Sequence, residues 1–144
     1  MDGPSITTSI PYDSPSVALA WLTDVLGFSV SDVFHDAAGN LAFAQLVWGN
    51  GAIFVSGRSP ADNPWAAVGP CSISLVADDE AHVARIHGRV VAAHGEVVRE
   101  PQLSRTPLFP EGSYQLDVRD PEGNLWTVGT FRPRVADTST QLPE

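Results

Sequence analysis

Histidine can bind a metal ion or transfer a proton near neutral pH, and the chain contains four histidines. His82 and His87 lie five residues apart in a segment expected to be helical, so their side chains diverge by about 140° around the helix axis. His87 and His94 share a helix face but are separated by about 10 Å along it. Neither pair can bind one ion. We therefore expect these three on a solvated helix face, and His35 at the surface of a strand.

The nucleophilic side chains show no catalytic pattern. Cys71 is the single cysteine, so it forms no internal disulfide and no thiolate metal site alone, and we expect a small buried side chain. The chain has no Gly-x-Ser-x-Gly sequence, which is typical of a nucleophile elbow. All eight basic residues are arginine, which excludes Schiff-base chemistry on a lysine. We identify no catalytic residue on these grounds.

Composition narrows the classes of partner. A chain of 144 residues with 43% hydrophobic residues is typical of one globular domain. The net charge of -9 repels phosphate backbones, so we expect no nucleic-acid partner, whereas a cationic small molecule would be attracted. No apolar run approaches the roughly 20 residues of a membrane span, and the N-terminus does not resemble a signal peptide. We expect no membrane partner and a cytoplasmic location.

The elements that would position any site occur in a repeated order of strand, helix and three strands. Alternation and helical spacing predict strands at 6–12, 29–35, 41–48 and 52–56, with a helix from Ser14 or Ser16 to Gly27. The second half repeats this with strands at 71–76, 97–103, 114–118 and 125–131, and a helix capped by Asp78 or Asp79 that ends at Gly95. Gly49-Asn50 before the fourth strand corresponds to Gly123-Asn124 before the eighth. We expect module one at about 5–57, a linker at about 58–69, module two at about 70–133 and a frayed polar tail at 134–144.

Several stretches resemble one known family. The helix opening at 14–22 (SPSVALAWL), the turn Gly49-Asn50-Gly51 and above all the stretch 120–126 (DPEGNLW) are similar to the vicinal-oxygen-chelate superfamily. That group includes glyoxalase I, extradiol dioxygenases, fosfomycin-modifying enzymes and bleomycin-resistance proteins. The resemblance implies an α+β fold of two tandem βαβββ modules, a cupped mixed sheet with helices on its convex face, and commonly a homodimer.

The resemblance also implies where metal ligands would lie. Metal enzymes of the family carry His or Gln in the first strand of each module and Glu in the last. Those sites correspond here to Thr7 and Ser72, to Thr127, and to Ile53 or Phe54. Hydroxyl and hydrocarbon groups are poor ligands for a divalent ion. We therefore expect no metal, no cofactor and no catalytic centre of the family's kind.

Strand alternation predicts which side chains line the cup. If Thr127 points inward, Trp126 and Val128 face the helices, and so do Ile10, Ile73 and Leu75. Aromatic side chains could add area for a guest, although a core position is the simpler expectation for Phe43 and Phe54, and Trp48 could lie in the core or contact a guest or a second copy. Glu111, Asp117 and Glu122 could attract a cation, but solvated charges are the simpler expectation. The candidate ligand-binding residues are Thr7, Ser9, Phe43, Trp48, Phe54, Trp65, Ser72, Ser74, Phe109, Tyr114 and Thr127.

These features favour a metal-free binding protein. The leading hypothesis is sequestration of a large aromatic or cationic natural product, such as an antibiotic, in a cleft between two copies of the chain. One alternative is a glyoxalase-like lyase or isomerase, or a dioxygenase-type enzyme, whose ligands lie in a different register. Another is a metal-independent enzyme that uses Tyr114, His35 or a carboxylate, and a third is a regulatory role with an empty pocket. The modules could pair within a chain or between chains.

Overall fold

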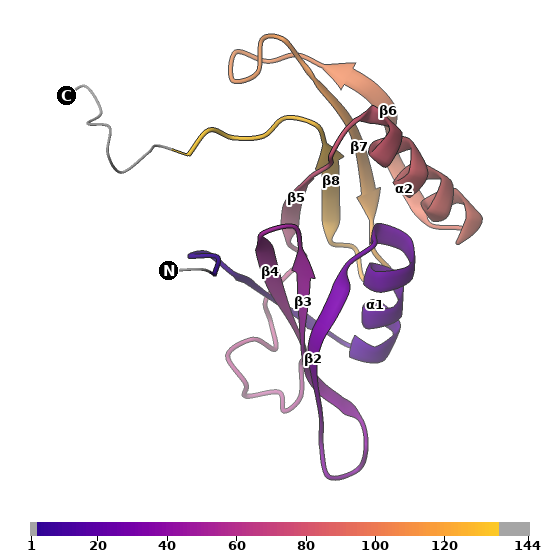
Figure 1. Cartoon of the computed structure of the whole chain (residues 1–144). Helices are drawn as coiled ribbons and strands as arrows, with labels where there is room; N and C mark the ends of the chain where they lie inside the picture. The colour runs from indigo at the N-terminus through magenta and orange to yellow at the C-terminus, as the bar shows by residue number, and fades with distance from the viewer. Residues whose placement is uncertain (1–2, 136–144) are drawn as a thin grey trace, which may run out of the picture.

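A computed structural model describes residues 3–135 of the chain as two four-stranded mixed sheets with helices on one side (Figure 1). This confirms the α+β fold with two tandem βαβββ modules. The expected tail beyond residue 135 lies outside the described residues. Module one contains β1 (Thr8–Tyr12), α1 (Pro15–Trp21), η1 (Leu22–Leu26), β2 (Ser29–His35), β3 (Leu41–Trp48) and β4 (Gly51–Gly57). Module two contains β5 (Ser72–Val76), α2 (Glu80–Ala92), β6 (Glu96–Ser104), β7 (Ser113–Arg119) and β8 (Leu125–Gly129).

The two sheets share one topology. Their strand orders are β1-β4-β3-β2 and β5-β8-β7-β6, and in each sheet the first strand runs parallel to the last. Ser9 lies opposite Phe54 in sheet one, and Ser74 lies opposite Thr127 in sheet two. Positions in one module can therefore be compared directly with positions in the other.

The first helix changes its winding where it meets the core. It begins at Pro15 and continues after Trp21 as one π-helical turn, η1, which ends at Gly27 with a φ of 98°. Leu22, Val25 and Leu26 are all buried. These residues stand at positions i, i+3 and i+4, a spacing that equally predicts a regular α-helix, so the sequence pattern does not distinguish the wider turn. Arg89 of α2 donates from Nε to the Val25 carbonyl oxygen at 2.8 Å, which ties the two helices together.

The second helix ends differently from the expectation. α2 begins after Asp79, whose carboxylate accepts the His82 amide N–H at 2.8 Å, as the capping prediction requires. The residue in the left-handed region at its other end is His94, with a φ of 56°, and not Gly95. A side chain at Gly95 would place its Cβ 2.9 Å from Val90 Cγ1. Gly95 is therefore required for close packing rather than for its backbone angle.

One continuous core lies between the sheets and the helices. Tyr12, Trp126 and Ile86 are fully buried in it, and residues of both modules contribute. Figure 1 shows α1 and α2 on the same side of the two sheets, so the opposite faces of both sheets remain open. Cys71 differs from its expected burial, because it is half-exposed at the start of β5. Its backbone N–H donates to Asn124 Oδ1 at 2.7 Å.

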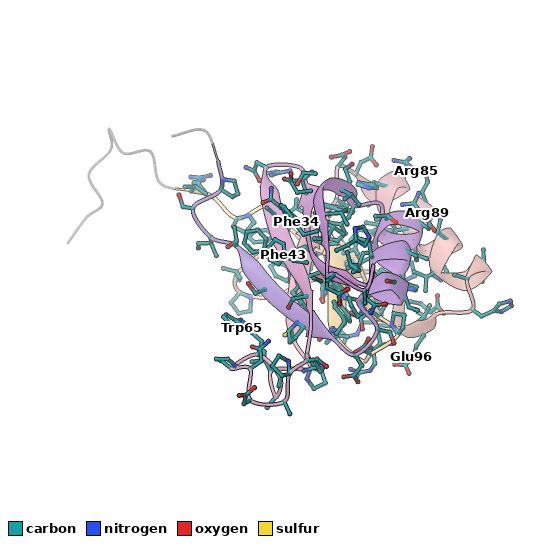
Figure 2. The ribbon with its side chains drawn as sticks, turned by 90° about the horizontal axis from the view of Figure 1, so that it is seen from below. Phe34, Phe43, Trp65, Arg85, Arg89 and Glu96 are labelled. Carbon is teal, nitrogen blue, oxygen red and sulfur yellow. The ribbon has the colours of Figure 1, made fainter. Side chains whose placement is uncertain are left out.

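The connection between the modules is held by one arginine. Arg58 donates from its guanidinium to the carbonyl oxygens of Ala66 and Val68 at 3.1 and 2.6 Å, and its Nε lies 3.1 Å from an Asp13 carboxylate oxygen. Trp65 projects from this segment with 48% of its surface exposed (Figure 2). The linker is thus an ordered loop that presents one aromatic side chain.

Candidate functional site

The open faces of the sheets carry the residues that alternation predicted. Ile10, Leu75, Trp126 and Val128 are buried toward the helices, as expected. Ser9, Ser74 and Thr127 therefore lie on the opposite, open faces, and so does Ser72, which is exposed in β5. Thr7 is exposed just before β1 begins.

Module one presents an aromatic open face. Phe43 of β3 and Phe54 of β4 stack with ring centroids 5.3 Å apart and an interplanar angle of 26°. Phe34 of β2 lies 6.1 Å from Phe43, and Figure 2 shows these two rings side by side. The neighbours Ala44, Ile53 and Val55 are the buried ones, so the phenylalanines lie outside the core. Phe34 is 58% exposed, which leaves aromatic surface available for a contact.

Module two presents a polar open face. Asp117 of β7 is only 9% exposed, and its carboxylate accepts the Thr127 hydroxyl at 2.6 Å. The Arg99 guanidinium Nε lies 3.6 Å from the other carboxylate oxygen. The expectation of a solvated charge at Asp117 is therefore wrong. A Cβ at Gly129 would lie 2.8 Å from Ser113 Oγ, so the absence of a side chain at Gly129 leaves room for this hydroxyl.

Register makes the contrast between the faces explicit. Phe43 pairs with Phe34 and with Ser56, whereas Gln115 pairs with Gln102 and with Gly129. Phe54 lies beside Ser9 on the open face of sheet one, and Thr127 lies beside Ser74 on that of sheet two. The open face of module one thus carries three phenylalanines, whereas that of module two carries two glutamines and a threonine. A guest that contacted both faces would meet hydrocarbon on one side and hydrogen-bonding groups on the other.

Four aromatic candidates from the sequence lie elsewhere. Tyr114 shares the parity of Leu116 and packs against the core, so it does not join the open face. Phe109 contacts Phe131 with ring centroids 4.9 Å apart, and Trp65 stands in the linker. Trp48 is half-buried where the modules meet, and its indole Nε1 donates to the Val76 carbonyl oxygen at 3.1 Å.

The helix histidines are also less solvated than expected. The His82 ring stacks on Trp48 with centroids 5.4 Å apart and an interplanar angle of 6°, and its Nδ1 accepts the Asp78 backbone N–H at 3.0 Å. His87 Nε2 lies 2.7 Å from a Glu100 carboxylate oxygen. His35 and His94 are exposed. Helical spacing could not reveal these contacts, because their partners come from β3, β6 and the segment before α2.

Glu122 likewise has a structural partner rather than only solvent. Its two carboxylate oxygens accept the backbone N–H groups of Asp13 and Ser14 at 2.6 and 2.9 Å. This side chain from module two therefore binds the chain just before α1. Ser14 itself makes no side-chain capping bond. Glu111 remains exposed, as expected.

The positions that the family resemblance assigns to metal ligands do not fit a divalent ion. The Thr127 hydroxyl is a donor to Asp117, Phe54 offers only hydrocarbon, and Ile53 is buried in the core. The carboxylate beside Thr127, that of Asp117, is already engaged by this hydroxyl and by Arg99, and neutral hydroxyls alone hold such ions poorly. Within residues 3–135, no group of three or more His, Cys, Asp or Glu side chains is arranged to hold a metal. In the same residues, no helix has the length and apolarity to cross a bilayer.

Comparisons with known proteins agree with this architecture. TioX from Micromonospora sp. ML1 is similar at 28% identity, with a TM-score of 0.67 over 88% of this chain and 98% of that one. A lactoylglutathione lyase from Agrobacterium tumefaciens is similar at 26% identity, with a TM-score of 0.64 over 88% and 93%. A protein from the mobile metagenome of V. Pseudocholerae shares the fold at 17% identity, with a TM-score of 0.67 over 92% and 98%. No curated protein matches the chain significantly in sequence.

The assignment to a family rests on sequence as well as shape. A family model described as the Glyoxalase/Bleomycin resistance protein/Dioxygenase superfamily matches residues 6–128, which span both βαβββ modules. The chain therefore belongs to the Glyoxalase/Bleomycin resistance protein/Dioxygenase superfamily.

Proposed function

We propose that this protein binds and sequesters a large natural product, such as an antibiotic, that combines a flat aromatic part with a cationic or hydrogen-bonding part. The observation that carries the proposal is the pair of unlike open faces: stacked phenylalanines in module one and the Asp117 and Thr127 pair in module two. Aromatic rings hold a flat guest through its faces, and a nearly buried carboxylate favours a positive charge. The net charge of -9 also attracts a cation over longer distances.

The site is completed by a second copy of the chain. Both helices cover the same side of the sheets, so the two open faces of one chain point to the same side and not at each other (Figure 1). A guest held between an aromatic and a polar face then needs the aromatic face of one protomer and the polar face of its partner. Sedimentation analysis should accordingly give the mass of a homodimer.

Binding without chemistry is the simplest role for these groups. Among the residues of the open faces, hydroxyls, amides and phenyl rings outnumber groups that can activate a substrate. Asp117 is engaged by Thr127 and Arg99, which orients it as a fixed charge. The rival hypothesis is a glyoxalase-like lyase, which the 26% identity to a lactoylglutathione lyase supports. A dioxygenase-type or metal-independent enzyme and an empty regulatory pocket are the remaining alternatives.

Calorimetric titration with two flat probes tests the proposal. Proflavine is a cation at pH 8, and acridine is a neutral ring system of similar shape. The wild-type protein should bind proflavine more tightly, and Asp117→Asn should remove that preference. Phe54→Ala should weaken both probes by about three- to tenfold, because one aromatic contact is lost. Val91→Ala, a change on the exposed side of α2, is the control and should leave both affinities unchanged.

Recovery of the ligand decides between binding and catalysis. The bound compound should be released with its mass unchanged. Formation of lactoylglutathione from methylglyoxal and glutathione, together with a stoichiometric metal in elemental analysis, would favour the lyase instead. Absence of any ligand-induced rise in melting temperature at concentrations far above a plausible dissociation constant would favour the regulatory role.

A further inference from the structure

A cavity lies where the two modules meet, and its lining reaches the open face of sheet two at Ser74. It has a volume of about 610 Å³, within the range of roughly 300–1,000 Å³ that is common for small-molecule sites. Its walls come from the start of β1, the β3–β4 hairpin, β5 and the beginning of α2. Ile6, Ile53 and Ile73 supply apolar surface, while Asp78 and Arg132 place opposite charges on the lining.

The two inter-strand turns at the module boundary differ. The β7–β8 turn places the Glu122 carboxylate on the chain before α1, where it accepts two backbone N–H groups. The related β3–β4 turn consists of Gly49 and Asn50, and it has no carboxylate to reach the start of α2. Gly49 and Asn50 line the cavity together with Trp48 and His82.

The backbone of β5 forms one edge of this cavity. β5 pairs only with β8 among the described strands. The Cys71 carbonyl oxygen accepts the Leu125 N–H, and the Ala77 N–H donates to the Gly129 carbonyl oxygen, so odd-numbered residues turn their main-chain groups toward β8. Ser74 and Val76 must then turn theirs toward the cavity, and the bond from Trp48 Nε1 to the Val76 carbonyl oxygen agrees with that direction.

The part of the cavity wall that meets this edge is held in place by stacked rings. Trp48 packs between Phe28, with ring centroids 5.4 Å apart, and His82, also at 5.4 Å. Because its Nε1 is bonded to Val76, the indole cannot rotate without losing a hydrogen bond. A ligand would therefore meet a pre-formed wall, which lowers the ordering cost of binding.

We propose that this cavity is a second ligand site, for a neutral flat lactam or a similar ring that presents an N–H donor and a C=O acceptor side by side. The Ser74 carbonyl oxygen and the Val76 N–H lie two residues apart on one strand edge and have opposite polarity. A cis-amide within a ring can satisfy both at once, as a neighbouring strand would. The opposite charges of Asp78 and Arg132 favour a ligand without net charge.

Three bicyclic probes test this pairing by calorimetry and by amide chemical shifts in the ¹⁵N-labelled protein. 2-Quinolinone has both groups, 1-methyl-2-quinolinone lacks the N–H, and quinoline lacks the carbonyl. Binding of 2-quinolinone should shift the Val76 amide signal. Each of the other probes should bind at least about fivefold more weakly, because one hydrogen bond is lost.

Matched substitutions locate the site. Thr8→Trp places a large ring on the cavity lining and should abolish binding of 2-quinolinone, whereas Ser16→Trp, on an exposed position of α1, should not. Both variants should retain proflavine binding at the open faces, so this proposal can fail independently of the proposed function. Equal affinities for the three probes, shifts confined to the open faces, or no binding at millimolar 2-quinolinone would each overturn it. The probe comparison needs no variant, so it remains decisive if Thr8→Trp does not fold.

Discussion

Two turns in this protein share one five-residue sequence pattern, Asp-x-x-Gly-Asn, and the same local geometry. In the turn 36–40 between β2 and β3, Asp36 Oδ1 accepts the backbone N–H groups two and four residues later, both at 2.9 Å. In the turn 120–124 between β7 and β8, Asp120 Oδ1 does the same at 2.9 and 3.1 Å. Gly39 and Gly123 adopt left-handed φ values of 84° and 92°.

The surroundings of these turns differ completely. Asp36 is exposed at the tip of a hairpin, whereas Asp120 is 5% exposed at the boundary between the modules. The second carboxylate oxygen of Asp120 accepts the Tyr12 hydroxyl at 2.6 Å, Asn124 Nδ2 at 2.8 Å and Trp126 Nε1 at 3.1 Å. The turn 120–124 therefore also connects module two to β1, through the hydrogen bond from Tyr12 to Asp120. Local sequence determines the shape of such a turn, and its surroundings determine its contribution to stability.

The largest change in stability is expected when the Asp120 or the Asp36 carboxylate is removed. Asp120→Ala leaves three buried donors without their acceptor, so we expect the free energy of unfolding to fall by about 3–5 kcal/mol. Asp36→Ala loses only solvent-exposed turn bonds and should cost about 0.5–1 kcal/mol. Urea denaturation of both variants measures the difference. Similar losses would show that burial adds nothing to the turn.

A smaller effect is expected when one donor of the buried network is deleted. Tyr12→Phe removes the hydroxyl that binds Asp120, a hydrogen bond to a charged group, and should cost about 2 kcal/mol at pH 7. Burial raises the pKa of the Tyr12 hydroxyl above its usual value, and the adjacent Asp120 charge raises it further.

The sign of the resulting pH dependence follows from that raised pKa. Below pH about 10 both folded and unfolded states keep Tyr12 protonated, so its contribution is constant. Above pH 10 the unfolded state releases this proton first, and stability falls by about 1.4 kcal/mol per pH unit. The Tyr12→Phe variant has no such proton to release, so it should lose less stability above pH 10 than the wild type. The free energies of unfolding of the two proteins should therefore converge as the pH rises. Parallel curves would contradict the raised pKa.

The smallest change in stability is expected when the left-handed glycine that the two turns share is replaced. Gly39→Ala and Gly123→Ala each force a side chain into the left-handed region, which costs about 1–2 kcal/mol. No atom lies within 4 Å of a Cβ at position 39, and the nearest to one at position 123 is Pro70 Cγ at 3.9 Å. Backbone strain should therefore be the main cause of the lost stability in both variants. Thermal denaturation should give nearly equal losses, and a clear inequality would show that burial alters the local cost.

Much of the fold could be predicted from the chain because its patterns are local. Alternation identified strands such as Ser29–His35 and Leu41–Trp48 with the bounds that the structure has. It also identified Trp126 as a core residue and Thr127 as a residue of the open face. The π-helical turn at Leu22–Leu26 escaped prediction, because the spacing of its apolar residues is the same as that of a regular α-helix.

The candidate site was less predictable. Phe43 and Phe54 could be read as core or as open-face residues until register placed them beside each other. Asp117 looked like a solvated charge because nothing near it in sequence indicates Thr127 and Arg99 as partners. Tyr114 seemed free to line a cup, but strand parity turned it toward the core.

The amino-acid sequence by itself determined the repeated order of strands and helices, the two Asp-x-x-Gly-Asn turns and the small hydroxyl residues on the open faces, because each depends on neighbours along the chain. Only the tertiary structure decided that Asp120, and not Asp36, meets a tyrosine 108 residues away. The energy of a buried carboxylate depends on the donors that folding brings to it and on the water that folding removes. Those donors come from distant segments, so no local pattern encodes them.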